Sequence, residues 1–296
     1  MQDKAKISQK KWQYLAGYMD GDGSFSIGSH PHKNNYINYD VHLTISSVHK
    51  PTAKWLIDVF GGQIVNSQDK RPNRKPAQQW YVSNSTHQLS ILSGVTPFLK
   101  LKQRQAEILT EFLNLGGRTF QNPEIRKVLV DEIKQRNTYF LPVYRTSALV
   151  NQCGADRSDY QYFAGILDAE GCISLYENKR SFDPKLQLAN TDMRVFDFLL
   201  DRFGGSVTTV KRENRALGNW SLPTKFLEST LLATIPYLVT KRAQGMLLLN
   251  WLRSRKTISD TESREHISRF RELNFRGISP TTNTTDCPEK WTGDRV

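Results

Sequence analysis

Apolar and polar residues alternate along two widely separated stretches of the chain. Residues 40–46, DVHLTIS, place Val41, Leu43 and Ile45 on one side and polar residues on the other. Residues 185–189, KLQLA, show the same alternation. A period of two is typical of a strand with one buried face, so each stretch predicts a β-strand in a half-covered sheet.

Each predicted strand is followed by an amphipathic segment that ends in two glycines. These segments are KWLIDVFGG, 54–62, and DFLLDRFGG, 197–205. A double glycine after an apolar-periodic run is a helix stop. Beyond each stop the pattern predicts a hairpin whose second strand contains a tryptophan, Trp80 in one case and Trp220 in the other. The chain therefore carries two copies of one unit.

A helical run opens each copy and ends in acidic residues. The runs are YLAGYMDGDGSF and YFAGILDAEGCI, in which Asp22 and Glu170 occupy the same place. Each copy closes on a segment with a lysine at a matching position, Lys102 or Lys241. The predicted order per copy is helix, two strands, helix, two strands, then one or two helices, which indicates an α+β fold.

Two such units are expected to pack as a pseudo-symmetric pair about a twofold axis. Each would form a four-stranded antiparallel sheet with one polar face and one face covered by helices. The predicted organisation is an N-terminal repeat at 1–137, a linker at 138–158, a C-terminal repeat at 159–276 and a loosely ordered tail at 277–296.

Small residues recur four positions apart on the two opening helices. Gly17 and Gly21 form this stripe in the first copy, and Gly165 and Ala169 form it in the second. Residues at this spacing share a helix face, so the two helices are predicted to pack closely through them. Their carboxyl ends would then bring the two acids together, where they would repel without a cation between them. A divalent metal such as Mg²⁺ is the simplest candidate.

The composition points to a polyanionic partner. The 41 Lys and Arg residues exceed the 29 Asp and Glu residues and give a net charge of +12, which favours nucleic acid. Polar side chains on the strands are predicted to face base edges, and basic side chains are predicted to contact phosphates. The predicted strand-face residues are Ser26, Gly28, His30, His32, Asp40, His42, Thr44, Ser46, Gln79, Tyr81, Ser83, Ser174, Tyr176, Asn178, Lys185, Gln187, Asn219 and Ser221. The predicted phosphate contacts are Lys33, Lys70, Arg71, Arg74, Lys75, Arg180, Lys211 and Arg212.

The sequence gives no sign of secretion or membrane insertion. The amino terminus, MQDKAKISQKKW, has no apolar core of signal-peptide length, and no later run is long enough to cross a bilayer. Cys153, Cys172 and Cys287 are far apart and form no CxxC pair, so free thiols are expected. We expect an intracellular protein without a membrane partner, from a bacterial or phage cytoplasm or an organelle.

The two opening runs resemble the signature of the LAGLIDADG homing endonucleases, in the single-chain form with two motif copies. LAGYMDGDG and FAGILDAEG carry this resemblance, which extends over roughly residues 8–275. It implies a saddle of two αββαββα repeats, a long double-stranded DNA target and metal-dependent cleavage of both strands across the minor groove, leaving short 3′ overhangs. It also implies a monomer with two or more divalent ions, expected to be Mg²⁺, shared between the motif acids.

The resemblance assigns roles to particular residues of this chain. Asp22 and Glu170 would hold metal, helped by the carbonyls of Gly21 and Ala169, with Glu170 replacing the usual aspartate but keeping its charge. Lys102 and Lys241 would support the transition state. His49 and Asp192 fall where the family places a polar residue that orders water, and their difference implies unequal cleavage rates for the two strands. These six catalytic residues are Asp22, Glu170, Lys102, Lys241, His49 and Asp192.

Two other functions use the same scaffold. One is a maturase that binds intron RNA and assists splicing without cutting DNA, and the other is a DNA-binding regulator without cleavage activity. The loss of a motif acid would favour either alternative. Both acids and both lysines are present, which favours an active nuclease.

Overall fold

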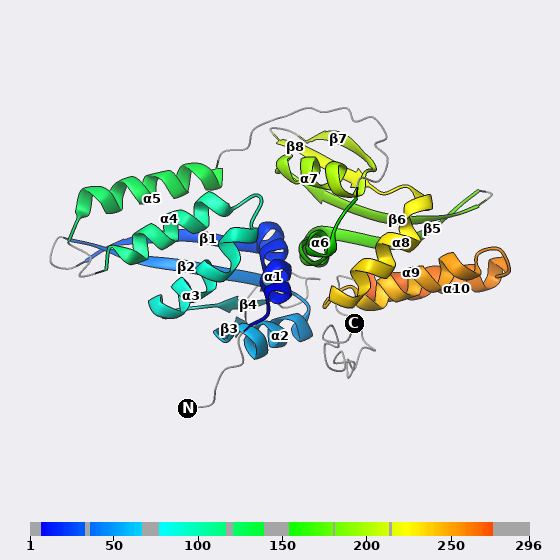
Figure 1. Ribbon diagram of the computed structural model, residues 1–296, viewed down its shortest axis with the longest axis horizontal. Helices are drawn as coiled ribbons and strands as arrows, with labels where there is room; N and C mark the ends of the chain where they lie inside the picture. Colours follow the sequence, from blue (N-terminus) through cyan, green and yellow to red (C-terminus); the bar gives the residue numbers. More distant parts are fainter. Residues whose placement is uncertain are drawn as a thin grey trace.

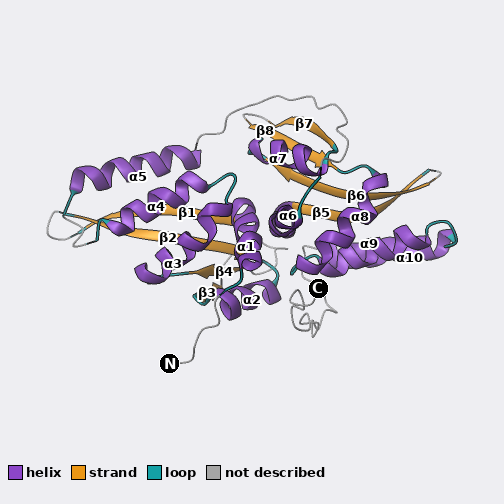
Figure 2. Ribbon diagram, in the orientation of Figure 1, coloured by secondary structure: helices purple, strands orange, loops and turns teal. Residues whose placement is uncertain are grey.

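Two four-stranded antiparallel sheets form the framework, each with helices on one face (Figures 1 and 2). The predicted α+β class, with two repeats of one unit, is therefore confirmed. This architecture comes from a computed structural model, which describes residues 7–32, 36–66, 77–116, 121–138, 154–179, 181–212 and 215–274.

The two repeats have the same order of elements. The first contains α1 (Gln9–Asp22), β1 (Gly23–Pro31), β2 (Ile37–Ser47), α2 (Lys50–Phe60), β3 (Gln63–Asn66), β4 (Gln78–Tyr81), α3 (Ser85–Val95), α4 (Gln103–Asn114) and α5 (Pro123–Thr138). The second contains α6 (Arg157–Glu170), β5 (Gly171–Asn178), β6 (Ser181–Asn190), α7 (Arg194–Phe203), β7 (Ser206–Arg212), β8 (Arg215–Ser221), α8 (Thr224–Thr234), α9 (Arg242–Ser254) and α10 (Asp260–Asn274). A short 3₁₀ turn precedes α4 at Thr96–Phe98 and α9 at Ile235–Tyr237.

Strand order is also the same in both sheets. The first sheet runs β1-β2-β4-β3 and the second runs β5-β6-β8-β7. Gly23 pairs with Ile45 in the first sheet, and Gly171 pairs with Leu188 at the equivalent place. Since both opening strands start directly after a motif acid, the register fixes where each acid lies relative to its sheet.

The double glycines end α2 and α7 through a specific contact with the predicted tryptophans. Gly62 has a φ of +87°, in the left-handed region that glycine adopts without strain. The indole of Trp80 donates a 2.7 Å hydrogen bond to the carbonyl of Gly61, and Trp220 donates an equal bond to Gly204. The glycine stop and the buried tryptophan of the next hairpin are therefore one packing unit.

The helical part of each repeat is larger than the sequence predicted. Three α-helices follow the second hairpin in the described part of each repeat, where one or two were expected. α3 was missed because its exposed positions carry serine and threonine, although Ile91, Leu92 and Val95 bury one face. α5 and α10 lie against the edge strands, where Asn137 donates to the carbonyl of Phe25 at 2.9 Å and Asn274 donates to that of Ile173 at 3.1 Å.

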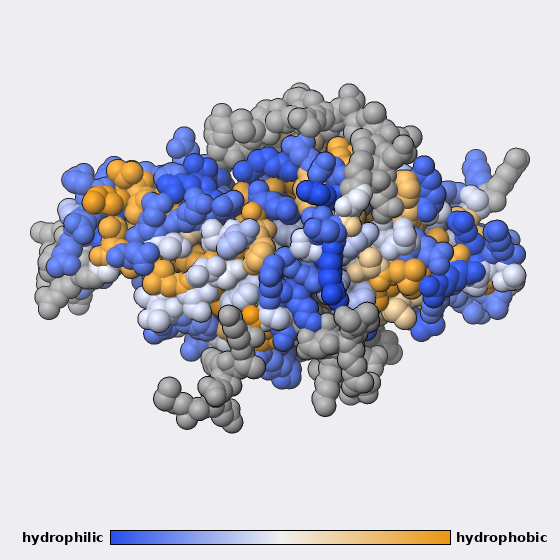
Figure 3. All heavy atoms as spheres, in the orientation of Figure 1, coloured by the Kyte–Doolittle hydropathy of each residue, from blue (hydrophilic) through white to orange (hydrophobic). Residues whose placement is uncertain are grey.

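The core lies between each sheet and its helices. Phe25, Leu43 and Trp80 are buried in the first repeat, and their counterparts are buried in the second. On the helix side, apolar side chains gather over α5 (Figure 3), where Ile125 and Val128 are exposed. No helix among the described residues has the length and apolar content to cross a membrane.

Parts of the predicted domain organisation lie outside the described residues. α5 ends at Thr138 and α6 begins at Arg157, and residues 139–153 of the predicted linker are outside the description. The predicted tail at 277–296 is outside it as well.

Candidate functional site

α1 and α6 lie side by side at the centre of the molecule and touch through their backbones (Figure 1). A Cβ atom added to Gly17 would lie 2.0 Å from the carbonyl oxygen of Tyr162. A Cβ atom added to Gly165 would lie 2.0 Å from the carbonyl oxygen of Tyr14. No side chain fits in either place, so the small residues of the two stripes set the distance between the helices.

The two motif acids stand at the adjoining ends of these helices. Asp22 is the last residue of α1 and Glu170 the last residue of α6, and both are exposed. A Cβ atom on Gly21 would lie 2.4 Å from the Cβ of Ala169 and 3.2 Å from the Cγ of Glu170. The helix ends are thus in contact, and both carboxylates remain open to solvent.

A lysine lies against the end of each helix. Lys102 Nζ donates to the carbonyls of Met19 at 2.9 Å, Gly21 at 3.1 Å and Gly23 at 2.8 Å. The carbonyl of Gly21, predicted as a metal ligand, accepts the lysine in this structure. Lys241 Nζ donates to the carbonyl of Asp168, in the last turn of α6. A cation at the carboxyl end of a helix is favoured by the helix dipole.

Burial and nearby carboxylates act on Lys102 in opposite directions. Burial lowers the pKa of Lys102, and the negative charges of Asp20, Asp22, Glu170 and Asp192 oppose this change. Both motif acids thus act electrostatically on the same ammonium group. The carboxylates and the lysine form one charged cluster at the junction of the repeats.

Sequence reasoning gave no role to the other acid of each motif. The carboxylate of Asp20 is buried and accepts the backbone N–H groups of Lys100 at 2.7 Å, Leu101 at 3.1 Å and Lys102 at 2.9 Å. It also accepts the phenol of Tyr162, from the other repeat, at 2.7 Å. Burial raises the pKa of Asp20 while these hydrogen bonds lower it. Asp20 therefore fixes the loop that carries Lys102.

Asp168 does the same in the second repeat. It accepts the N–H groups of Val239 at 2.7 Å, Thr240 at 2.9 Å and Lys241 at 2.7 Å, and the phenol of Tyr14 at 2.8 Å. The signal for both residues was present in the sequence, because an acid stands two residues before the exposed acid in each copy.

His49 and Asp192 occupy equivalent turns but differ in their partners. His49 Nδ1 is hydrogen bonded to the hydroxyl of Thr52 at 2.7 Å. Asp192 is paired with Arg194, whose Nη2 lies 2.5 Å from the carboxylate. The two repeats thus present different chemistry at this position.

The strand pairing brings the predicted polar residues of the first repeat onto one face. Ser26 pairs with His42, Gly28 with Asp40, and His30 with Asn38. Cross-strand partners point to the same side of a sheet. Of the remaining predictions in this repeat, Thr44 pairs with Tyr81 and Ser46 with Gln79, while His32 and Ser83 follow the ends of β1 and β4.

The second sheet has the same arrangement. Ser174 pairs with Lys185, and Gln187 pairs with Ser221. The other predicted positions on this face are Tyr176, Asn178 and Asn219. Ser174 is 5% exposed, so its hydroxyl is less available to an external partner than its neighbours are.

Some side chains of the polar faces are paired with one another. His30 Nε2 lies 3.2 Å from a carboxylate oxygen of Asp40, and Lys185 Nζ lies 2.6 Å from one of Asp183. Both pairs are partly solvent-exposed, and an exposed ion pair such as Lys185–Asp183 contributes roughly 0–1 kcal/mol. Such pairs can be exchanged for contacts with a ligand at little cost.

The register also adds residues that the sequence did not suggest. β3 and β7 place further side chains on the polar faces: Gln63, Val65, Ser206, Thr208 and Val210. β3 is short, and β7 is rich in threonine and valine. Because Val65 and Val210 are exposed, the sequence alone does not indicate which face of each strand is polar. Each polar face therefore extends across all four strands.

Six of the predicted phosphate contacts lie outside the described residues: Lys33, Lys70, Arg71, Arg74, Lys75 and Arg180. The backbones of Lys211 and Arg212 belong to β7, and only their backbones are described. Among the cysteines, Cys172 is described and is a free thiol, and Cys153 and Cys287 are outside the description.

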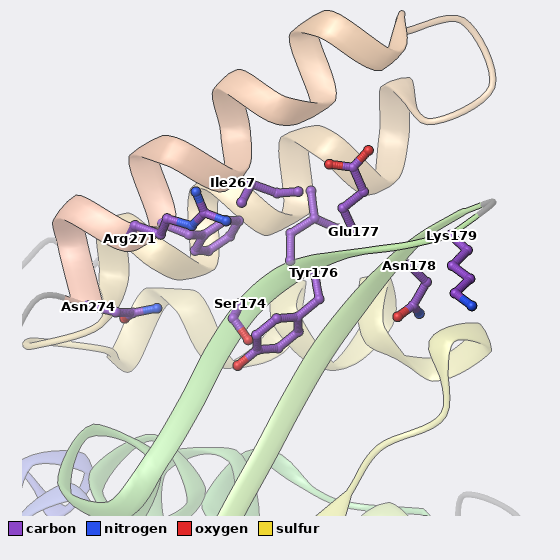
Figure 4. Close-up of a pocket in the computed structure, with 10 residues that line it drawn as sticks. Ser174, Tyr176, Glu177, Asn178, Lys179, Ile267, Arg271 and Asn274 are labelled. Carbon is purple, nitrogen blue, oxygen red and sulfur yellow. The ribbon is translucent and has the colours of Figure 1, made fainter.

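A hollow of about 600 Å³ lies at the outer edge of the second sheet, between β5 and α10 (Figure 4). Tyr176 and Lys179 line it from the strand side, and Ile267 and Arg271 line it from the helix side. Arg264 of α10 bridges to Glu177 of β5 at 2.9 Å and holds the helix against the strand. The hollow adjoins the polar face at Tyr176.

The donor set at the helix ends fits a hard divalent cation. Exposed carboxylates on adjoining helices leave room for water and phosphate oxygens, which Mg²⁺ retains when it binds protein. No group of three or more His, Cys, Asp or Glu residues suited to a metal occurs among the described residues. At the helix ends, Asp22 and Glu170 would supply two carboxylates to such an ion.

Part of the sequence is similar to known DNA endonucleases. The sequence model of the LAGLIDADG endonuclease family matches residues 15–104. DNA endonuclease I-CreI of Chlamydomonas reinhardtii is 28% identical over 119 residues, which cover 40% of this chain and 72% of that protein.

Solved structures resemble the whole two-repeat fold. The LAGLIDADG homing endonuclease I-GzeII in complex with its DNA target has a TM-score of 0.64 at 15% identity, over 88% of this chain and 97% of that one. The I-LtrWI LAGLIDADG homing endonuclease bound to target DNA has a TM-score of 0.64 at 16% identity, over 92% and 100%. I-SmaMI bound to uncleaved DNA in the presence of calcium ions has a TM-score of 0.63 at 14% identity, over 88% and 97%.

These likenesses confirm the resemblance carried by the two motifs: the first repeat matches the LAGLIDADG endonucleases in sequence, and both repeats together have the fold of the single-chain LAGLIDADG homing endonucleases.

Proposed function

We propose that this protein is a site-specific DNA endonuclease that cuts both strands of a long target in a divalent-metal-dependent reaction. The observation that carries the proposal is the junction of α1 and α6. There the exposed Asp22 and Glu170 meet at adjoining helix ends, and Lys102 and Lys241 lie against the same ends.

The polar sheet faces supply the DNA-binding surface. They lie on both sides of the junction, so a duplex lying along them would place its central base pairs over the two acids. The net charge of +12 favours binding to the phosphate backbone, and polar side chains on strands can read base edges. The solved structures of I-GzeII and I-LtrWI, which share the fold, contain bound target DNA. Arg271 and Lys179, at the hollow beside β5, are further candidates for phosphate contacts.

A bound Mg²⁺ would polarise the attacked phosphate and lower the pKa of a bound water. Asp22 and Glu170 would hold the ion through carboxylate oxygens. Lys102 and Lys241 would place positive charge beside the phosphate as negative charge develops on it. Paired cuts by a monomer across the minor groove would leave short 3′ overhangs.

The test begins with selection of binding sites from a randomised duplex library. Selected DNA is then incubated with the protein in Mg²⁺ or in EDTA, beside the variants Asp22→Asn and Glu170→Gln. We expect double-strand cleavage in Mg²⁺ alone, and binding without double-strand cleavage by the variants. Double-strand cleavage that persists in EDTA would reject the metal dependence. If no DNA site is selected or cut and the protein instead binds intron RNA in a parallel assay, the nuclease is rejected and a maturase is favoured.

A further inference from the structure

The residue before each lysine is held by the opposite repeat. Leu101 precedes Lys102, and its carbonyl accepts a 3.0 Å hydrogen bond from Arg194 Nη2 of α7. Thr240 precedes Lys241, and its hydroxyl is hydrogen bonded to that of Thr52 of α2 at 2.7 Å. In each case the start of a helix in one repeat reaches the lysine loop of the other.

The residue that contacts the Lys102 loop, Arg194, is part of an ion pair. Arg194 is oriented by Asp192, which accepts its Nε at 2.9 Å and its Nη2 at 2.5 Å. Asp192 is itself held, because its backbone N–H donates to Asn190 Oδ1 at 2.8 Å. Nη2 donates one N–H to Asp192, and its second N–H is thereby directed at the carbonyl of Leu101. On the same loop, Lys100 Nζ lies 4.3 Å from the ring centre of Phe198, so the loop contacts α7 at two points.

The contact to the Lys241 loop is neutral. Thr52 is fully buried, and its hydroxyl links His49 Nδ1, at 2.7 Å, to the hydroxyl of Thr240. The turn before Thr52 has the same hydrogen bond as the turn before Arg194. The backbone N–H of His49 donates to Ser47 Oγ at 3.1 Å, as that of Asp192 donates to Asn190 Oδ1.

The two contacts cannot be exchanged between the repeats. When the two turns are aligned, His49 corresponds to Asp192. Thr52 then corresponds to Val195, and Pro51 corresponds to Arg194. Valine has no hydroxyl and proline has no side-chain donor. Each repeat therefore uses a residue that the other lacks.

We propose that Arg194 and Thr52 are positioning residues that act across the repeats, Arg194 on Lys102 and Thr52 on Lys241, so that each controls the cutting of a different DNA strand. The strand assignment rests on the proposed nuclease function. The positioning does not, because it is a property of the two loops.

The first measurement is hydrogen exchange of the free protein, which needs no cleavage. Arg194→Ala is expected to speed amide exchange at 100–102 and to leave 239–241 unchanged. Thr52→Val is expected to do the reverse, and Thr52→Ser, which keeps the hydroxyl, to match the wild type. Equal changes in both loops, or no change in either, would overturn the proposal.

The second measurement gives the cutting rate of each strand separately, on a selected target labelled on both strands. Each variant is expected to slow one strand by about tenfold, which corresponds to about 1.4 kcal/mol, and the affected strand should differ between the variants. Slowing of the same strand, or of both equally, would overturn the strand assignment. If the wild type cuts no DNA, the proposed function fails and the exchange result still decides the positioning.

Discussion

The phenol of Tyr162 donates a 2.7 Å hydrogen bond to the carboxylate of Asp20, which belongs to the other repeat. The bond from Tyr14 to Asp168, at 2.8 Å, is its counterpart in the opposite direction. Each carboxylate also fixes the loop that ends in a lysine of its own repeat. The packing of the two repeats and the placement of both lysines thus depend on the same two buried acids.

Removing either phenol should weaken the junction. Tyr162→Phe and Tyr14→Phe are each expected to lower the free energy of unfolding by about 1–2 kcal/mol, because a buried carboxylate loses one of its donors. Urea titration followed by tryptophan fluorescence measures the change. Tyr176→Phe, at a half-exposed tyrosine on β5, is the control and should have almost no effect. If all three variants lose the same free energy of unfolding, the hydrogen bonds of Tyr14 and Tyr162 to the buried acids do not stabilise the junction.

The same tyrosines predict a loss of stability in alkali. Burial, and next the charge of Asp168, raises the pKa of Tyr14; burial and the charge of Asp20 raise that of Tyr162. The unfolded chain gives up these protons near pH 10 while the folded chain keeps them. Their contribution is therefore complete below about pH 10 and is lost as the pH rises further.

The thermal midpoint, measured between pH 8 and 11, should fall above about pH 10 in the wild type. The fall should be shallower in the double variant Tyr14→Phe with Tyr162→Phe. Identical slopes in the two proteins would show that ionisation of these phenols does not control alkaline stability.

Close contact of the helices predicts a large effect of a single methyl group. Gly17→Ala or Gly165→Ala places a Cβ against a backbone carbonyl that cannot move without separating α1 from α6. We expect each to cost about 2–4 kcal/mol in urea titrations, well beyond the small gain in helix propensity. Ser90→Ala, on the exposed side of α3, is the control and should change stability by less than about 0.5 kcal/mol. If either glycine variant is as stable as this control, the helices do not meet as described.

Neutralising a buried acid should affect the lysine loop as well as stability. Asp20→Asn replaces a carboxylate oxygen that accepts backbone N–H groups by an amide that donates. A loss of about 2–4 kcal/mol is expected because buried donors are left without an acceptor. Hydrogen exchange should quicken at 100–102 in this variant and at 239–241 in Asp168→Asn. Protection that stays unchanged in the matching loop would contradict the role given to these acids.

The repeated pattern was sufficient to predict the fold. The alternation at 40–46 and 185–189, the double glycines and the tryptophans all recur in order, and each is a local signal that survives without knowledge of tertiary contacts. α3 and α8 were missed because serine and threonine are mixed with the apolar residues of both helices and weaken their periodicity. The polar positions on β3 and β7 were missed because these strands are short or rich in valine, and only the strand pairing sets their register.

The site was predictable only in part. Exposed acids at two helix ends follow from the motif, but a buried acid shows its function only through its partners. Asp20 bonds to a loop far along the chain and to a tyrosine of the other repeat. The contacts of Arg194 and Thr52 also join distant segments, and no spacing in the sequence indicates them.

Cleavage of a selected DNA target by the wild type, Asp22→Asn and Glu170→Gln, in the presence of Mg²⁺, tests the central claim most directly. The wild type should cut both strands, and each variant should bind the target with similar affinity and make no double-strand break. A variant that still cuts both strands at the wild-type rate would contradict the claim that the two helix ends form one metal-dependent nuclease centre.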